Sequence, residues 1–181
     1  MIIGVPKEIK LQEHRIGLTP DSVKTLTKKG HEVLIQNNGG FEAGFTNEDY
    51  KNSGAKIIEK AEDIFKKAEL IVKVKEPQMS EVAMIRENQI IYTYLHLAAA
   101  KELTEGLVKS KAICIAYETV TDDNGRLPLL APMSAVAGRM SIQAGAHSLE
   151  KNQKGRGLLL GGAPGVEPAN VVILGGGEVG E

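Results

Sequence analysis

Four polar side chains of complementary types each follow an apolar run in this sequence. Arg15, Lys75, His96 and Glu118 supply a guanidinium, an amine, an imidazole and a carboxylate. A guanidinium can clamp an anion, and an imidazole can act as an acid or a base near neutral pH. Placed in one cleft, they would form an anion clamp, an amine, an acid/base group and a carboxylate.

Each of the four also has a purely structural interpretation. Arg15 can be a solvated arginine, and a lysine at a strand end such as Lys75 is usually just exposed. His96 lies between two leucines, where a histidine is more often a satisfied structural residue. Glu118 can cap a helix or pair with a lysine. Taken singly, the structural interpretation is the better one for each, and only their joint placement favours a functional site.

The last residues of the chain carry a glycine pattern. Gly175, Gly177 and Gly180 form G-x-G-x-x-G directly after the apolar run 171–174, which we predict to be a buried strand. This is the spacing of a dinucleotide-binding turn, in which backbone amides meet a pyrophosphate. The helix that normally follows, and the acidic residue about 20 positions further on that binds ribose, are not in the sequence.

The elements that must position these residues are predicted from the alternation of apolar runs with helical segments, which favours a parallel α/β sheet. Ligands of such sheets bind just beyond the carboxyl ends of the strands, so the four polar residues are expected along one edge. The expected strands are 2–5, 32–36, a short one near 57, 70–74, 89–94 and 112–116.

Helices are predicted between these strands. Thr19 and Pro20 have the types expected of an N-cap and a first helical residue. Further helices are expected after Thr46, over 61–68 and over 99–110. Small residues and methionines fill 132–150, which we interpret as one long helix that can pack closely against a second domain or subunit.

A shift in composition divides the chain. Nine of the 20 glycines fall within residues 155–181, which marks a glycine-rich linker. We therefore expect a Rossmann-like parallel sheet over 1–130, followed over 131–181 by a linking helix and the first strand of a second, nucleotide-binding domain.

Composition excludes several classes of function. Basic and acidic residues nearly balance, 22 against 23, which gives no support to nucleic-acid or membrane-surface binding. Cys114 is the single cysteine, so neither an intrachain disulfide nor a cysteine metal site is expected, and no metal is assigned. No apolar run has the length of a membrane span or a signal peptide, and a reducing, cytoplasmic compartment is the expectation.

An ordered set of motifs along the whole chain resembles the alanine dehydrogenase family and its relative, the nucleotide-binding component of proton-translocating transhydrogenase. The matching stretches are Gly4-Val5-Pro6-Lys7-Glu8, Glu13 to Pro20, Val72 to Pro77, Tyr94-Leu95-His96-Leu97-Ala98, Ala131-Pro132-Met133-Ser134, and Gly165-Val166 through Gly180. The order of these motifs is far more specific than the glycine turn alone.

The resemblance implies a reversible, NAD-dependent oxidative deamination of L-alanine to pyruvate and ammonium. By the same resemblance Arg15 binds the substrate carboxylate, Lys75 holds its carbonyl side, and His96 donates and accepts the proton. Tyr94, Glu118 and Met133 are expected to support the site. The cofactor is expected to contact Ser134 and the turn residues Gly175, Gly177, Glu178, Val179 and Gly180.

The family pattern extends beyond Glu181, so the resemblance implies a truncated chain that lacks most of the NAD domain and is inactive alone. The complete family protein is implied to be a cytoplasmic homohexamer. Glu178 departs from the family's small or apolar residue, and a carboxylate there would oppose phosphate charge unless it points away. Two alternatives stay open: a transhydrogenase component, which the presence of Lys75 and His96 disfavours, and a non-catalytic domain that binds a small carboxylate or a partner chain.

Overall fold

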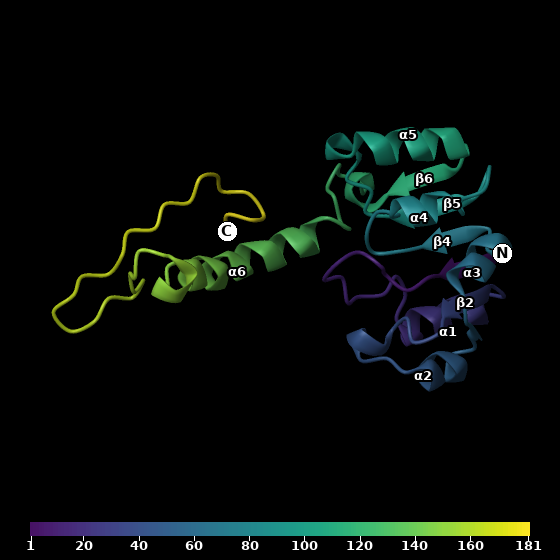
Figure 1. The fold of residues 1–181 in the computed structure, drawn as a ribbon, viewed down its shortest axis with the longest axis horizontal. Helices are drawn as coiled ribbons and strands as arrows, with labels where there is room; N and C mark the ends of the chain where they lie inside the picture. Colours follow the sequence, from purple (N-terminus) through teal and green to yellow (C-terminus); the bar gives the residue numbers. More distant parts are fainter. The chain divides into compact units, whose positions relative to one another are not determined.

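The structure is a computed structural model that describes all residues from Met1 to Glu181 (Figure 1). The chain forms two compact units, Met1–Glu118 and Thr119–Glu181. The boundary expected at residue 130 stays a prediction, and the two units are described separately.

The N-terminal unit contains a six-stranded sheet in which every pair of neighbouring strands is parallel. The strand order is β3-β2-β1-β4-β5-β6. The chain first adds β2 and β3 on one side of β1 and then adds β4, β5 and β6 on the other side, as in doubly wound folds. The expected Rossmann-like parallel sheet is therefore confirmed. The strands are β1 (Ile2–Val5), β2 (Glu32–Gln36), β3 (Lys56–Ile58), β4 (Leu70–Val72), β5 (Ile90–Thr93) and β6 (Ile113–Ala116).

Two helices begin at the threonine N-caps that the sequence indicates. Thr19 accepts a hydrogen bond from the Ser22 amide, and Thr46 forms a capping box with Asp49. The four-residue α4 was not predicted, because it is too short to show helical periodicity. The helices of this unit are α1 (Pro20–Lys28), α2 (Asn47–Asn52), α3 (Ala61–Lys67), α4 (Met79–Val82) and α5 (Lys101–Ser110), with 3₁₀ turns at Phe41–Ala43, Leu97–Ala99 and Tyr117–Thr119.

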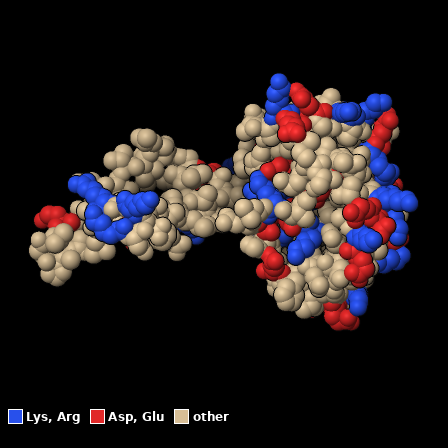
Figure 2. Space-filling view, viewed as in Figure 1, with Lys and Arg blue, Asp and Glu red and all other residues tan.

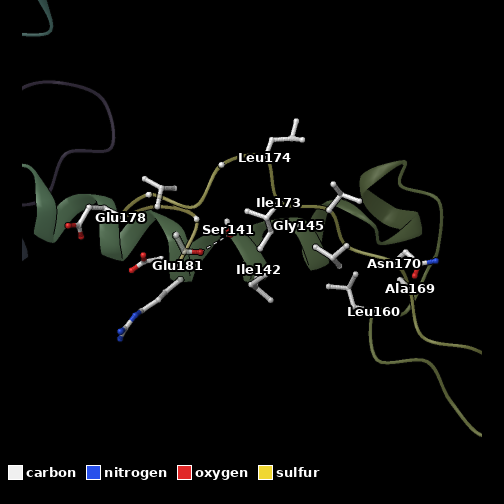
Figure 3. A pocket seen from close by; sticks show the side chains of 18 of the residues that line it. Ser141, Ile142, Gly145, Leu160, Ala169, Asn170, Ile173, Leu174, Glu178 and Glu181 are labelled. Carbon is white, nitrogen blue, oxygen red and sulfur yellow. Dashed lines mark hydrogen bonds between the residues drawn. The ribbon is translucent and has the colours of Figure 1, made fainter.

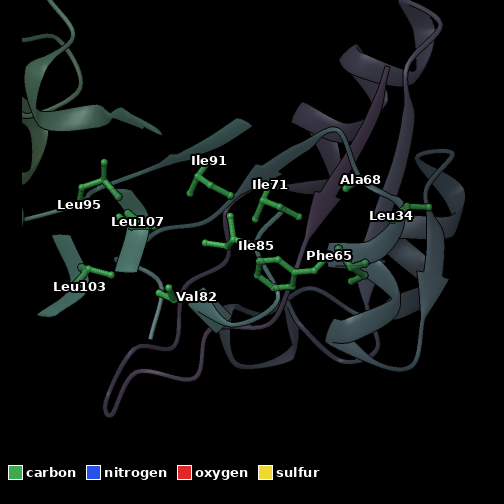
Figure 4. Close-up of a cluster of buried hydrophobic side chains, with 11 residues drawn as sticks. Leu34, Phe65, Ala68, Ile71, Val82, Ile85, Ile91, Leu95, Leu103 and Leu107 are labelled. Atoms are coloured by element: carbon green, nitrogen blue, oxygen red, sulfur yellow. The ribbon is translucent and has the colours of Figure 1, made fainter. Parts of the chain in front are cut away.

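Two hydrophobic cores cover the two faces of this sheet. Along β2, Leu34 belongs to one core while Val33 and Ile35 belong to the other, as the period of two in a strand requires. The first core, drawn in Figure 4, joins strand residues to side chains of α3, α4 and α5. The second core joins them to Val23 of α1 and Tyr50 of α2. The strand ends therefore project from a sheet that is packed on both faces.

A buried ionic cluster lies beside the first core, just past the end of β4. The ammonium of Lys73 is 2.9 Å from a carboxylate oxygen of Glu8 and 2.9 Å from one of Glu81. The Lys73 side chain is 1% exposed and both carboxylates are equally inaccessible. The pKa of Glu81 is raised because burial outweighs the attraction of Lys73. The expected strand 70–74 ends at Val72, and the chain then carries the Lys73 side chain into this cluster.

The second unit is built on one long helix, α6 (Ala131–Ser148), which confirms the helix expected over 132–150. A 3₁₀ turn at Lys151–Gln153 follows. The buried strand expected over 171–174 was wrong. These residues form no strand and are exposed, Leu174 to 95%. A buried parallel strand needs hydrogen-bonded neighbours and helices over its faces, and this unit contains only one isolated bridge, between Ala163 and Val166.

The ionic cluster yields a prediction about stability. Replacing Lys73 by Met should destabilise the chain by about 3–5 kcal/mol, because Glu8 and Glu81 would be left buried without a counter-charge. Urea unfolding followed by circular dichroism measures this. Lys101→Met, which removes an exposed pair with Glu105, should cost less than about 1 kcal/mol. Equal costs for the two variants would contradict this account of the cluster.

Candidate functional site

The loop after β1 carries the first candidate residue. Arg15 donates from Nε and Nη2 to the two carboxylate oxygens of Glu13, at 2.8 Å and 2.6 Å. The Glu13 side chain is only 7% exposed, whereas Arg15 is half exposed. We call this two-bond pair the fork of Arg15 and Glu13. It fixes the plane of the guanidinium before any ligand binds.

Gly17 fixes where this loop lies. A β-carbon at Gly17 would come 2.7 Å from the carbonyl oxygen of Val72 and 3.2 Å from the amide nitrogen of Lys73. Only glycine permits that approach of the loop to the backbone at the end of β4. The loop that carries Arg15 is thereby packed against the segment that carries Lys75.

Lys75 follows β4 by three residues. Its carbonyl oxygen accepts a hydrogen bond of 2.8 Å from the Thr93 hydroxyl, and its amide lies 3.4 Å from Glu8. Its backbone is therefore tied both to β5 and to the loop after β1. The ammonium makes no hydrogen bond or ion pair in the structure, although its charge acts on Glu13. Lys75 is thus a half-buried cation without a direct partner, beside the fork of Arg15 and Glu13.

His96 follows β5 and has a left-handed backbone, with φ 50° and ψ 37°. This conformation is uncommon for a residue other than glycine. Glu118 stabilises it, because its carboxylate accepts hydrogen bonds from the amide of His96 at 2.7 Å and from the amide of Leu95 at 3.1 Å. Glu118 therefore holds the backbone of the candidate acid/base residue, a structural role at the candidate site.

Tyr94 lies between these groups. Its ring centroid is 6.0 Å from that of His96 and 5.0 Å from that of Tyr117, with which it packs edge to face. Burial raises the pKa of Tyr94, Glu118 raises it further, and the charge of Arg15 opposes the rise. The interaction with Arg15 connects the loop after β1 to the loop after β5.

The structure thus brings Arg15, Lys75, Tyr94, His96 and Glu118 together beyond the carboxyl ends of β1, β4, β5 and β6. Two acidic residues of this cluster were not assigned from the sequence. Glu13 holds Arg15, and Glu76 lies 3.4 Å from Nδ1 of His96. Glu76 directly follows Lys75, and Glu13 lies two residues before Arg15. This closeness in the sequence was the only signal that could have identified them.

The remaining candidates belong to the second unit. Met133 and Ser134 lie in the first turn of α6. The glycine turn lies along the same helix, where the carbonyl of Val179 touches Gly138. Figure 3 shows the hollow between them, of about 1320 Å³, with Ser141, Ile142 and Gly145 of α6 on one side and Glu178 near its end. This hollow contains none of the polar residues at the strand ends.

The glycine turn has the backbone freedom that close contact with a ligand needs. Gly175 has φ +101°, a conformation that favours glycine, and no atom lies within 4 Å of where side chains at Gly175, Gly176 and Gly177 would begin. Glu178 and Val179 are exposed. The residues thus leave room for a phosphate-bearing group.

Charged side chains on the face shown in Figure 2 mix both signs over the N-terminal unit, in agreement with the formal net charge of −1. None of the helices has the length and apolar character required to cross a lipid bilayer.

The fold and the strand-end cluster together define a class: a doubly wound α/β protein with a cationic site at its strand ends and a glycine turn after it. Comparison with family models makes this specific. Residues 4–137 match the family described as alanine dehydrogenase/PNT, N-terminal domain, and residues 141–181 match its C-terminal domain. The chain belongs to the alanine dehydrogenase/PNT family.

Individual relatives agree. The chain is 55% identical over 181 residues to the alanine dehydrogenase of Halomonas elongata and 53% identical over 180 residues to that of Methanococcus maripaludis. All of this chain is covered in the first case and 99% in the second, but only 49% and 48% of those relatives. The chain therefore spans about half the length of the curated relatives it matches.

Solved structures show the same fold. An L-alanine dehydrogenase structure superposes with a TM-score of 0.88 at 55% identity, covering 99% of this chain and 50% of that one. A transhydrogenase from Sinorhizobium meliloti superposes with a TM-score of 0.73 at 20% identity, covering 83% and 43%. The second likeness supports the fold alone.

The fork of Arg15 and Glu13 predicts a pH dependence of stability. The hydrogen bonds from Arg15 outweigh burial and lower the pKa of Glu13 to about 2. Because the unfolded chain binds this proton at higher pH than the folded chain, the stabilisation is complete above the unfolded pKa of about 4.3 and is lost as pH falls toward about 2. Between pH 5 and 2.5, the unfolding free energy should fall less steeply for Glu13→Gln than for the unmodified chain. Parallel slopes in urea unfolding would contradict this.

Proposed function

We propose that this chain forms the substrate side of an NAD-dependent L-alanine dehydrogenase, which interconverts L-alanine with pyruvate and ammonium. The observation that carries the proposal is the unpaired ammonium of Lys75 beside the oriented guanidinium of Arg15. With Glu13, these groups total one net positive charge. A small monocarboxylate such as pyruvate would neutralise it.

Arg15 and Lys75 divide the binding of such a substrate. The exposed part of the guanidinium donates hydrogen bonds to the substrate carboxylate, while Glu13 keeps the plane of the guanidinium fixed. The Lys75 ammonium has no ion pair that must break before a substrate binds. It contacts the carbonyl oxygen of pyruvate and stabilises the negative charge that develops on that oxygen. Binding by groups that are already oriented lowers the entropic cost of reaching a reactive geometry.

His96 is proposed as the proton donor and acceptor. An imidazole suits this role near neutral pH, and this ring is half exposed at the site. Glu118 supports it by fixing the backbone that carries the ring, and Tyr94 packs beside it. Each proton taken up or released at the substrate would then pass through one imidazole nitrogen.

NAD is proposed as the cofactor, and it would accept or supply the hydride when bound. Gly175, Gly177 and Gly180, with Glu178 and Val179, would lie at its pyrophosphate, and Ser134 would contact it with support from Met133. The open space above Gly175 to Gly177 supports this assignment. Exposed Glu178 has room to point away from phosphate.

We propose further that the whole protein is a cytoplasmic homohexamer that acts in L-alanine catabolism. The exposed apolar side chains of α6, such as Met140 and Ile142, support association through this helix. The likeness to a transhydrogenase is distant, and Lys75 and His96 serve amino-acid chemistry that such a component does not need.

A chimera tests this function. Residues 1–181 would replace the matching half of the Halomonas elongata alanine dehydrogenase, and NADH oxidation with pyruvate and ammonium would be measured. We expect an active chimera, while residues 1–181 alone are expected to be inactive. Lys75→Ala and His96→Asn should each lower kcat/KM by about 100-fold or more, because each removes a group that acts on the reacting atoms.

Lys66→Ala is the matched control, since this exposed lysine of α3 lies outside the site and should leave the rate unchanged. An active chimera whose rate is indifferent to Lys75→Ala and His96→Asn would contradict the proposed roles. A folded chimera without activity would contradict the proposed function.

A further inference from the structure

Glu76 has a carboxylate oxygen that the fold leaves without a hydrogen bond. Its Oε2 atom is buried and has no hydrogen-bond partner, while Oε1 binds the ammonium of Lys10. Burying a carboxylate oxygen without a donor is costly, and such atoms are rare in folded proteins. The nearest cationic or donor group recorded for Oε2 is Nδ1 of His96, at 3.4 Å.

The ring of His96 is in the complementary situation. Glu118 holds the backbone of His96, but neither ring nitrogen makes a hydrogen bond. The ring is 51% exposed, and its Nδ1 atom lies 3.4 Å from Oε2 of Glu76, so a small rotation would bring the two atoms within ordinary hydrogen-bond distance. A buried acceptor without a hydrogen bond therefore faces an imidazole nitrogen that binds no other protein group, across the ends of β4 and β5.

We propose that Glu76 is a positioning residue for His96. Its Oε2 accepts the Nδ1 proton, which fixes the ring and leaves Nε2 as the nitrogen that faces the substrate. This inference rests on the proposed function for its consequence in catalysis, but the hydrogen bond itself does not depend on the reaction. A histidine that exchanges protons at one nitrogen needs its other nitrogen held in a single protonation state.

Lys10 connects this pair to the substrate-binding loop. It lies in the loop after β1 that also carries Glu13 and Arg15, and it occupies the second oxygen of Glu76. Burial raises the pKa of Glu76, but the hydrogen bond from Lys10 and the charges of Lys10 and His96 together lower it below its ordinary value. Glu76 is therefore an ionised acceptor, and Lys10 leaves only Oε2 for the imidazole.

The tautomer of His96 tests the proposal in residues 1–181 directly. At pH 9, where imidazoles are neutral, long-range ¹H–¹⁵N NMR distinguishes a proton on Nδ1 from one on Nε2. We expect His96 to carry its proton mainly on Nδ1. Glu76→Met should shift the population toward Nε2–H, and the loss of one set of signals in His96→Asn assigns the resonances.

His14 provides a matched control, because it contacts Glu42 through its own Nδ1 at an exposed position. Glu42→Met should change the signals of His14 and leave those of His96 unchanged. A proton mainly on Nε2 of His96 in the unmodified chain would overturn the proposal, and this measurement needs no variant to fold. An unchanged His96 tautomer in a folded Glu76→Met variant would overturn it as well.

Kinetics in the chimera give the second readout. Glu76→Met should lower kcat by about tenfold or more, while KM for pyruvate changes less than about twofold, because Arg15 and Lys75 still bind the substrate. Glu42→Met should leave both constants unchanged. A rise in KM at constant kcat would contradict a positioning role. An inactive unmodified chimera would count against the proposed function alone, since the tautomer is measured without turnover.

Discussion

The buried contact between Glu8 and the chain after β4 is the interaction on which the site depends. One oxygen of Glu8 accepts the Lys73 ammonium at 2.9 Å, and the other accepts the amide of Val74 at 2.6 Å. Glu8 begins the loop that ends in Arg15, and Val74 immediately precedes Lys75. Buried ion pairs often add little net stability, since desolvation offsets attraction. What this contact supplies is a fixed position for the two loops that carry Arg15 and Lys75.

Glutamate carboxylates also bind neighbouring loops at the other strand ends. Glu76, after β4, binds Lys10 in the loop after β1, and Glu118, after β6, binds the backbone amides at Leu95 and His96. Each of these glutamates thus binds a loop other than its own. Loops in a parallel sheet start at adjacent points but otherwise diverge. These contacts from glutamates to neighbouring loops keep the candidate cations and the imidazole within one site. A preorganised site needs less reorganisation when a ligand binds.

The sequence predicted the sheet well because its strands are apolar runs between capped helices, as at Thr19 and Thr46. It predicted which strand ends carry Arg15, Lys75 and His96, because parallel strands share one functional edge. It did not predict the partners Glu13 and Glu76, or the Gly17 contact, because these depend on where loops lie in space. The strand expected over 171–174 failed for a related reason. An apolar run becomes a buried strand only where neighbouring strands accept its hydrogen bonds, and the second unit provides none.

The central claim is that the strand ends of the N-terminal unit bind a small carboxylate through Arg15 and Lys75. Titration of ¹⁵N-labelled residues 1–181 with pyruvate, followed by amide chemical shifts, tests it most directly. The account predicts saturable shifts confined to the segments around Arg15, Lys75 and His96, and their loss in Lys75→Ala. Acetone, which has the carbonyl but not the carboxylate, should cause none of them. Saturable shifts at other surfaces only, or shifts that persist unchanged in Lys75→Ala, would contradict the claim.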